Sequence, residues 1–228
     1  KDLRKLAKRA ANVVGICLPY LFLPYAEKKL KNSKVLFGAQ NAYFEKNGAF
    51  TGEISAEMLK DYNCNLCIIG HSERRKIFDE SNELINKKII SCLKNQLTTI
   101  FCVGETLEEY DSQSTQNVVK KQLTAGLKDV SEKQLKNIIF AYEPVWAIGT
   151  GKSASGEYCN DVILFIKETI KKLYKLNSID GIKVLYGGSL SDINAKEILS
   201  EPYIDGGLIG GACLNITKFA KIINTIAE

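Results

Sequence analysis

Short runs of apolar residues alternate along the chain with longer stretches in which apolar residues recur at helical spacing. Seven runs have the length of strands: Val13–Leu18, Val35–Ala39, Leu66–Ile69, Thr99–Val103, Ile138–Tyr142, Ile182–Leu185 and Gly207–Ile209. Their apolar residues are continuous rather than alternating, which is typical of parallel strands that are buried on both faces. The stretches between the runs predict helices that cover such a sheet.

The helical pattern is clearest at Glu80–Asn95, where Leu84, Ile89 and Leu93 fall on one side together with the stem of Lys88. Similar stretches lie at Val118–Leu127, Val162–Leu173 and Ile216–Ala227, and Asp2–Ala11 reads as the body of a helix ahead of the first strand. Seven strands and eight helices in repeating order predict one α/β domain over residues 1–228.

The expected fold class is a (β/α)8 TIM barrel with its first β-strand missing from the given chain. A helix precedes the first apolar run, so we expect that strand to lie upstream of Lys1. The structural alternative is a doubly wound open sheet. That fold usually has fewer strands and a GxGxxG fingerprint after one of them, and this fingerprint does not occur in the sequence.

Charge and hydrophobicity bear on whether the protein binds nucleic acid or a membrane. The net charge is +5 over 228 residues and the basic residues are dispersed, so we expect a solvated surface and no nucleic-acid partner. The longest apolar stretch, Val13–Ala26, contains Pro19 and Pro24 and is shorter than the about 20 residues that span a bilayer, so no membrane partner is expected.

The cysteines indicate a reducing compartment. Their number, seven, is odd, and they fall within predicted strands and helices, so we expect free thiols and a cytoplasmic protein. Cys64 and Cys67 form a lone CxxC, and His71 is the only histidine, which leaves few ligands for zinc. We therefore expect core packing for this pair and no metal site.

Polar residues and glycines directly follow the predicted strands, and in a parallel barrel these positions converge on one rim. Glu143 ends a buried strand, where a dry environment suits a carboxylate base. His71 could polarise a carbonyl or shuttle a proton there. Taken alone, Glu143 could equally be a surface salt-bridge residue and His71 a satisfied core histidine. Arg74 and Arg75 favour a structural ion-pair cluster near a dimer interface.

Two glycine-rich segments follow the last two strands. Gly187-Gly188-Ser189 and Gly210-Gly211 allow backbone N–H groups to approach an anion, and this is the usual phosphate site of barrels. Gly149-Thr150-Gly151-Lys152-Ser153 is not a nucleotide P-loop, because Trp146 stands where that motif needs glycine. It predicts a lid tip, with a stiff hinge at Pro144–Trp146 and the Gly149 amide within reach of a phosphate.

Several segments together resemble the triosephosphate isomerase family, over a range from about Val13 to the C-terminus. They are Ile69–Arg75, Ala141–Lys152, Tyr186–Ser189, Ile209–Ala212, Gly38–Asn41, Gly48–Glu53 and Cys102–Thr106. The resemblance implies interconversion of dihydroxyacetone phosphate and D-glyceraldehyde 3-phosphate in glycolysis and gluconeogenesis, without a cofactor. Glutamate as the base and neutral histidine as the electrophile is the established arrangement of this family.

Carried onto this sequence, the resemblance makes His71 and Glu143 catalytic. Gly149, Ser189, Gly210 and Gly211 would bind the phosphate of a small triose phosphate, with Ser72 and Glu73 in support. It also implies a homodimer through the Gly48–Glu53 loop, which would insert into the neighbouring subunit.

One part of the family pattern has no counterpart here. The family carries an Asn-x-Lys segment at the end of its first strand, and its lysine neutralises the phosphate and the developing enediolate. The alternative function is therefore a catalytically silent truncated barrel that binds phosphate or partners without turnover. A different phosphosugar-binding barrel conflicts with the paired His71 and Glu143 segments.

Overall fold

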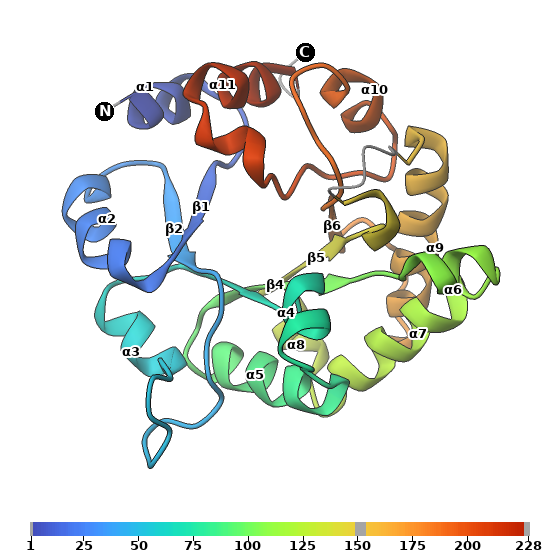
Figure 1. The fold of residues 1–228 in the computed structure, drawn as a ribbon, viewed down its shortest axis with the longest axis horizontal. Helices are drawn as coiled ribbons and strands as arrows, with labels where there is room; N and C mark the ends of the chain where they lie inside the picture. The colour runs from blue at the N-terminus through green and yellow to red at the C-terminus, as the bar shows by residue number, and fades with distance from the viewer. Residues whose placement is uncertain (1, 149–153, 226–228) are drawn as a thin grey trace.

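Six parallel strands form one curved sheet, in which each strand pairs with its neighbours in sequence order (Figure 1). The computed structural model describes residues 2–148 and 154–225. The strands are β1 (Gly15–Leu18), β2 (Leu36–Ala39), β3 (Leu66–Ile69), β4 (Thr98–Val103), β5 (Ile138–Tyr142) and β6 (Lys183–Tyr186). The strands predicted from the first six apolar runs are therefore confirmed.

The seventh predicted strand, Gly207–Ile209, forms only an isolated parallel bridge between Tyr186 and Gly207. The Tyr186 N–H donates to Gly206 O at 2.9 Å, and the Leu208 N–H donates to Tyr186 O at 2.8 Å. Strand β6 ends at Tyr186, which is the bridge partner of Gly207, so Leu208 and Ile209 fall beyond the end of β6. The prediction of a full strand here is wrong for this reason.

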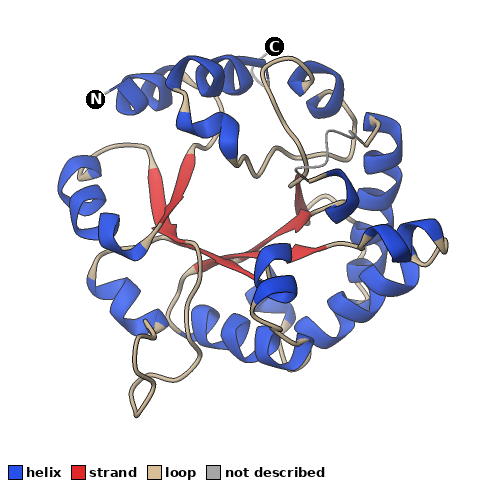
Figure 2. Ribbon diagram, in the orientation of Figure 1, coloured by secondary structure: helices blue, strands red, loops and turns tan. Residues whose placement is uncertain are grey.

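Helices surround the outer side of the sheet (Figure 2). The longer ones are α1 (Asp2–Arg9), α2 (Leu23–Leu30), α5 (Asn82–Lys94), α7 (Thr115–Gly126), α9 (Gly156–Tyr174) and α11 (Ile216–Thr225). The shorter ones are α3 (Ala56–Asp61), α4 (Ser72–Ile77), α6 (Leu107–Asp111), α8 (Glu132–Leu135) and α10 (Ala195–Leu199), with 3-10 turns η1 (Tyr20–Phe22), η2 (Val145–Ala147) and η3 (Gly211–Leu214). Eight helices were predicted; the additional ones are too short to show a helical period.

Successive side chains of each strand divide between two apolar layers. Ile68, Ile100, Cys102 and Ala141 face the inside of the curved sheet and form one cluster. Their neighbours in sequence pack outward against the helices in the main core, to which Ile69, Phe101, Val103, Phe140 and Tyr142 belong. This two-sided burial explains why the strand runs are continuously apolar. No helix in residues 2–148 or 154–225 is long and apolar enough to cross a bilayer.

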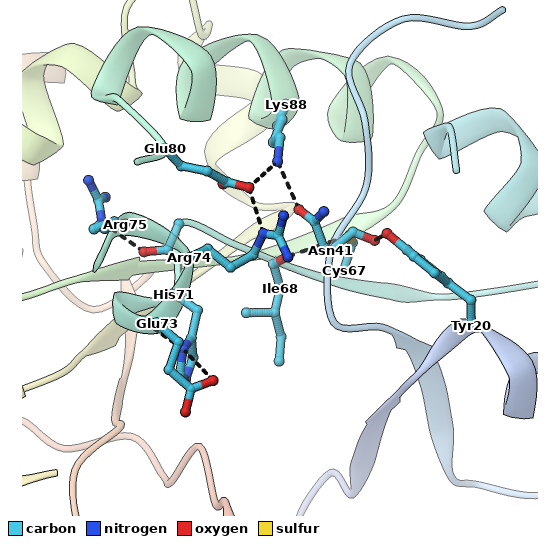
Figure 3. A network of polar contacts seen from close by, with 11 residues as sticks. Tyr20, Asn41, Cys67, Ile68, His71, Glu73, Arg74, Arg75, Glu80 and Lys88 are labelled. Carbon is cyan, nitrogen blue, oxygen red and sulfur yellow. Dashed lines mark hydrogen bonds and ion pairs between the residues drawn. The ribbon is translucent and has the colours of Figure 1, made fainter. Parts of the chain in front are cut away.

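A buried ionic network ties α4 and α5 to the end of β2 (Figure 3). The Glu80 carboxylate accepts from Arg74 Nε and from Lys88 Nζ, both at 2.5 Å, and Lys88 also donates to Asn41 Oδ1 at 3.0 Å. Tyr20 OH donates to the Asn41 carbonyl at 2.9 Å. The sequence predicted burial of the Lys88 stem only, but the ammonium is buried as well, because Glu80 compensates its charge.

Replacing Lys88 should destabilise the fold. Lys88→Met removes one cation from a buried carboxylate, and we expect the free energy of unfolding to fall by about 3 kcal/mol. Chemical denaturation measures this change. The matched control is Lys94→Met on the exposed end of the same helix, for which we expect less than about 0.5 kcal/mol. Equal losses for the two variants would contradict a structural role for the network.

Candidate active site

A cavity of about 2150 Å³ opens between β1 and Gly207–Ile209 and continues into the inside of the curved sheet. Its wall includes His71, Ser189, Gly210 and Gly211, four of the residues that the sequence singled out. Glu73 also lines it. Glu143 and Ser72 are buried behind His71, and Gly149 lies outside the described residues.

The backbone around His71 turns the imidazole out of the sheet and toward Glu143. Gly70 follows β3 with φ of +78°, a conformation that suits glycine, and His71 then caps the N-terminus of α4. Its Nδ1 accepts the N–H of Glu73 at 3.3 Å. In the neutral ring the proton therefore sits on Nε2, and this atom lies 2.9 Å from Glu143 Oε1.

Glu143 is fixed at the end of β5 by its backbone and its carboxylate. Its N–H continues the ladder by donating to Val103 O at 2.8 Å, and its side chain is 1% exposed. Oε2 accepts the N–H of Ser72 at 2.9 Å. The loop after β6 closes the other side, where a Cβ on Gly187 would lie 2.9 Å from Glu143 Cγ. The predicted dry environment of Glu143 is confirmed.

The charge of Glu143 raises the pKa of two neighbouring side chains, His71 and Cys102. Burial lowers the pKa of His71, but the contact with Glu143 and the negative charges of Glu143 and Glu73 raise it, and the net effect is a raised pKa. The Glu73 N–H at Nδ1 opposes protonation, since a protonated ring has no acceptor there. The pKa of the Cys102 thiol lies well above its ordinary value because the thiol is buried and close to Glu143.

A second buried carboxylate, Glu105, holds the predicted hinge after Glu143. Its Oε1 accepts Trp146 Nε1 at 2.7 Å, Tyr142 OH at 3.0 Å and Tyr158 OH at 3.1 Å. Burial raises the pKa of Glu105, and these hydrogen bonds oppose that effect. Because Val145 N–H also donates to Glu105 O at 3.1 Å, the hinge is fixed through both backbone and side chains.

The glycine-rich loops after β6 and Gly207–Ile209 line the cavity. Ser189 Oγ donates to Ala147 O at 2.8 Å, which joins the loop after β6 to η2. Gly210 and Gly211 stand at the start of η3. Among the backbone hydrogen bonds of the described residues, the N–H groups of Ser189, Gly210 and Gly211 have no acceptor. Such groups suit an anion.

The Gly48–Glu53 loop is exposed and projects from the body of the molecule just before α3 (Figure 1). The Phe50 ring packs on Tyr43, with centroids 4.9 Å apart, and Glu53 N–H donates to Phe50 O at 3.0 Å. Large apolar side chains are exposed on α2, α4 and their flanking turns, namely Leu21, Phe22, Tyr25, Ile77 and Phe78.

The cysteines do not form a ligand cluster in the described part of the chain. Cys64 and Cys67 are fully buried, which confirms their prediction as core residues, and all seven cysteines are free. Within residues 2–148 and 154–225 no three His, Cys, Asp or Glu side chains come together as a metal site would require.

Sequence reasoning missed two residues that support the site. Arg75 was predicted to belong to an ion-pair cluster, yet it donates to the carbonyls of Gly70 at 2.8 Å and Cys102 at 3.1 Å. Gln122 forms two hydrogen bonds with the backbone of Gly104. The only sequence signal for Gln122 is a polar residue on the buried face of a helix, next to Leu123.

Comparisons with known proteins agree with this geometry. The family model described as triosephosphate isomerase matches residues 1–226. The triosephosphate isomerase of Alkaliphilus metalliredigens is 45% identical over 98% of this chain and 90% of its own length, and that of Dictyoglomus thermophilum is 48% identical over 93% and 85%. The crystal structure of triosephosphate isomerase from Bartonella henselae superposes with a TM-score of 0.90 at 36% identity, covering 100% of this chain and 92% of that one. The chain belongs to the triosephosphate isomerase family.

Proposed function

We propose that this protein interconverts dihydroxyacetone phosphate and D-glyceraldehyde 3-phosphate by proton transfer through an enediolate. The observation that carries the proposal is the pairing of a buried carboxylate with the sole imidazole. Glu143 Oε1 and His71 Nε2 lie 2.9 Å apart, beside a cavity whose wall includes two glycine-rich loops. The activity is that of an aldose–ketose isomerase, which serves glycolysis and gluconeogenesis.

Glu143 is the base in this proposal, and His71 is the electrophile. The carboxylate leaves the Ser72 N–H, takes a proton from one substrate carbon, and returns it to the neighbouring carbon. The C–H electron pair passes into the enediolate, whose oxygen is stabilised by His71 Nε2–H. His71 gives its Nε2 proton to that oxygen and takes a proton from the neighbouring hydroxyl, so that the carbonyl moves to the other carbon. Ser72 and Glu73 support the pair through their backbone N–H groups, one at Glu143 Oε2 and one at His71 Nδ1.

The substrate phosphate binds the N–H groups of Ser189, Gly210 and Gly211, which have no acceptor among the backbone hydrogen bonds of the described residues. The Gly149 amide completes this set when the lid lies over the substrate. No cofactor takes part, because carboxylate and imidazole suffice for proton transfer.

We infer that the barrel is closed by a further strand between β1 and Gly207–Ile209. Both edges are unpaired on that side in the described residues, and an apolar cavity separates them. By family resemblance this strand carries the Asn-x-Lys segment, in one domain that includes residues 1–228. The cysteine chemistry supports a cytoplasmic location. A chain without the lysine would lose about 10²–10³ in rate and fit the silent-barrel alternative.

We also propose a homodimer through the Gly48–Glu53 loop. The loop projects from the body, and the exposed apolar residues of α2 and α4 offer a surface that a second subunit can cover.

The isomerase assay with Glu143→Asp tests the proposed chemistry. The shorter side chain withdraws the carboxylate by about 1 Å, so we expect kcat to fall about 100-fold with little change in KM. Intact mass on the same full-length sample shows whether the strand with its lysine is present. Wild-type turnover by a chain that contains it is the expected result. Normal turnover by Glu143→Asp would remove Glu143 from the role of base.

The single histidine permits a direct test of the His71–Glu143 contact. Because the folded-state pKa is raised, protonated His71 adds stability below about pH 6.5, and this contribution is lost as the pH rises through the folded-state pKa. NMR titration of the imidazole should give a lower pKa in Glu143→Gln than in the wild type. An unchanged pKa would show that the two side chains do not interact in solution.

Thr51→Arg tests the dimer. A bulky charge at the exposed tip of the loop should prevent its insertion into a partner, so we expect monomers with poor activity in analytical ultracentrifugation and assay. The control is Asn177→Arg, an exposed loop position before β6, which should stay dimeric. A Thr51→Arg variant that remains dimeric would argue against this interface.

A further inference from the structure

The edge of β4 extends past the end of its neighbour β3. The ladder between them ends at Ile69 and Phe101, because Gly70 turns the chain toward His71. Two further residues of β4 and then Gly104 continue alongside β5. Backbone groups on the β3 side of this extension therefore need other partners, since buried N–H and C=O groups are costly to leave unpaired.

Two side chains supply those partners. Arg75 donates to Cys102 O at 3.1 Å. Gln122, a buried residue of α7, accepts the Gly104 N–H at Oε1 and donates from Nε2 to Gly104 O, both at 2.9 Å. One primary amide thus satisfies both backbone groups of Gly104, as a paired strand would.

Glu143 lies directly on the opposite side of Gly104. Its N–H donates to Val103 O at 2.8 Å, and the Val145 N–H donates to Glu105 O at 3.1 Å. The two backbones are so close that a Cβ on Gly104 would lie 1.8 Å from the Glu143 carbonyl oxygen. Gly104 is therefore held between Gln122 and Glu143, and a shift of its peptide is passed to the Glu143 backbone.

We propose that Gln122 is a positioning residue for the base Glu143. Its amide fixes the Gly104 peptide and thereby sets where the Glu143 carboxylate stands relative to His71 and the substrate. The expected change in kcat rests on the proposed isomerase function. The expected change in the position of Glu143 relative to His71 does not depend on turnover. Gln122 itself does not touch the cavity, so it acts only through Gly104.

The test uses the full-length protein with Gln122→Met, which keeps the length of the side chain and removes both hydrogen bonds. We expect kcat to fall about 10-fold to 100-fold, while KM stays within about 2-fold, because a small misplacement of the base affects the chemical step most. The pKa of His71 should fall toward its value in Glu143→Gln. Gln122→Glu retains the acceptor for Gly104 N–H and should be intermediate in both measurements.

The matched control is Asn86→Leu. Asn86 Nδ2 also makes two backbone hydrogen bonds, to Gly126 O and Lys128 O, both at 2.8 Å and both outside the site. We expect it to lower stability without changing kcat or the His71 titration.

The outcomes separate the two proposals. If Gln122→Met and Asn86→Leu give the same kcat and the same His71 pKa, the positioning role is overturned. If Gln122→Met does not fold, the comparison of Gln122→Glu with Asn86→Leu decides in the same way. A wild-type protein that does not turn over triose phosphates would contradict the proposed function. The NMR titration of His71 would still decide whether Gln122 positions Glu143.

Discussion

The contact between His71 and Glu143 depends on strand order. His71 comes shortly after β3 and Glu143 directly follows β5, so β4 stands between the two strands that lead to them. The side chains meet only because the chain leaves β3 at Gly70 while β4 and β5 continue for further residues. A parallel ladder fixes the height of each strand end, and this constraint brings a carboxylate and an imidazole within 2.9 Å.

Burying Glu143 at this place carries an electrostatic cost that its surroundings reduce. The Ser72 N–H binds one oxygen, and the other faces the imidazole. Glu105 and Glu80 are stabilised in the same way, since each is buried and accepts hydrogen bonds from more than one element. These donors lie on helices, on a 3-10 turn and at a strand end, so the buried carboxylates connect the elements that surround the cavity.

The sequence predicted six strands well because a buried parallel strand is apolar on both faces. Val162–Ile166 is also continuously apolar, but it lies within a longer helical stretch, the later α9. The sequence also located His71, Glu143 and Ser189 just after strand ends, since position in a βα unit decides that. It could not predict the pairing of Gly104 with Gln122 or of Glu80 with Lys88. These contacts depend on the packing of whole helices, and a lone glutamine or lysine in a helix carries no signal for it. The last strand was overpredicted because apolar character alone does not show where the partner strand ends.

The distribution of positive charge around the cavity bears on the proposed phosphate site. Among the described cations that line the cavity, Arg74 and Lys183 have carboxylate partners, Glu80 and Asp205, and Lys218 of α11 also lies in the wall. A dianionic phosphate held by N–H groups of Ser189, Gly210 and Gly211 would gain dipole stabilisation from them but little net neutralisation. The enediolate would add negative charge close to the carboxyl group of Glu143. A lysine on the strand proposed between β1 and Gly207–Ile209 would add a cation to this wall, so closing the barrel and balancing the substrate charge would be achieved by the same element.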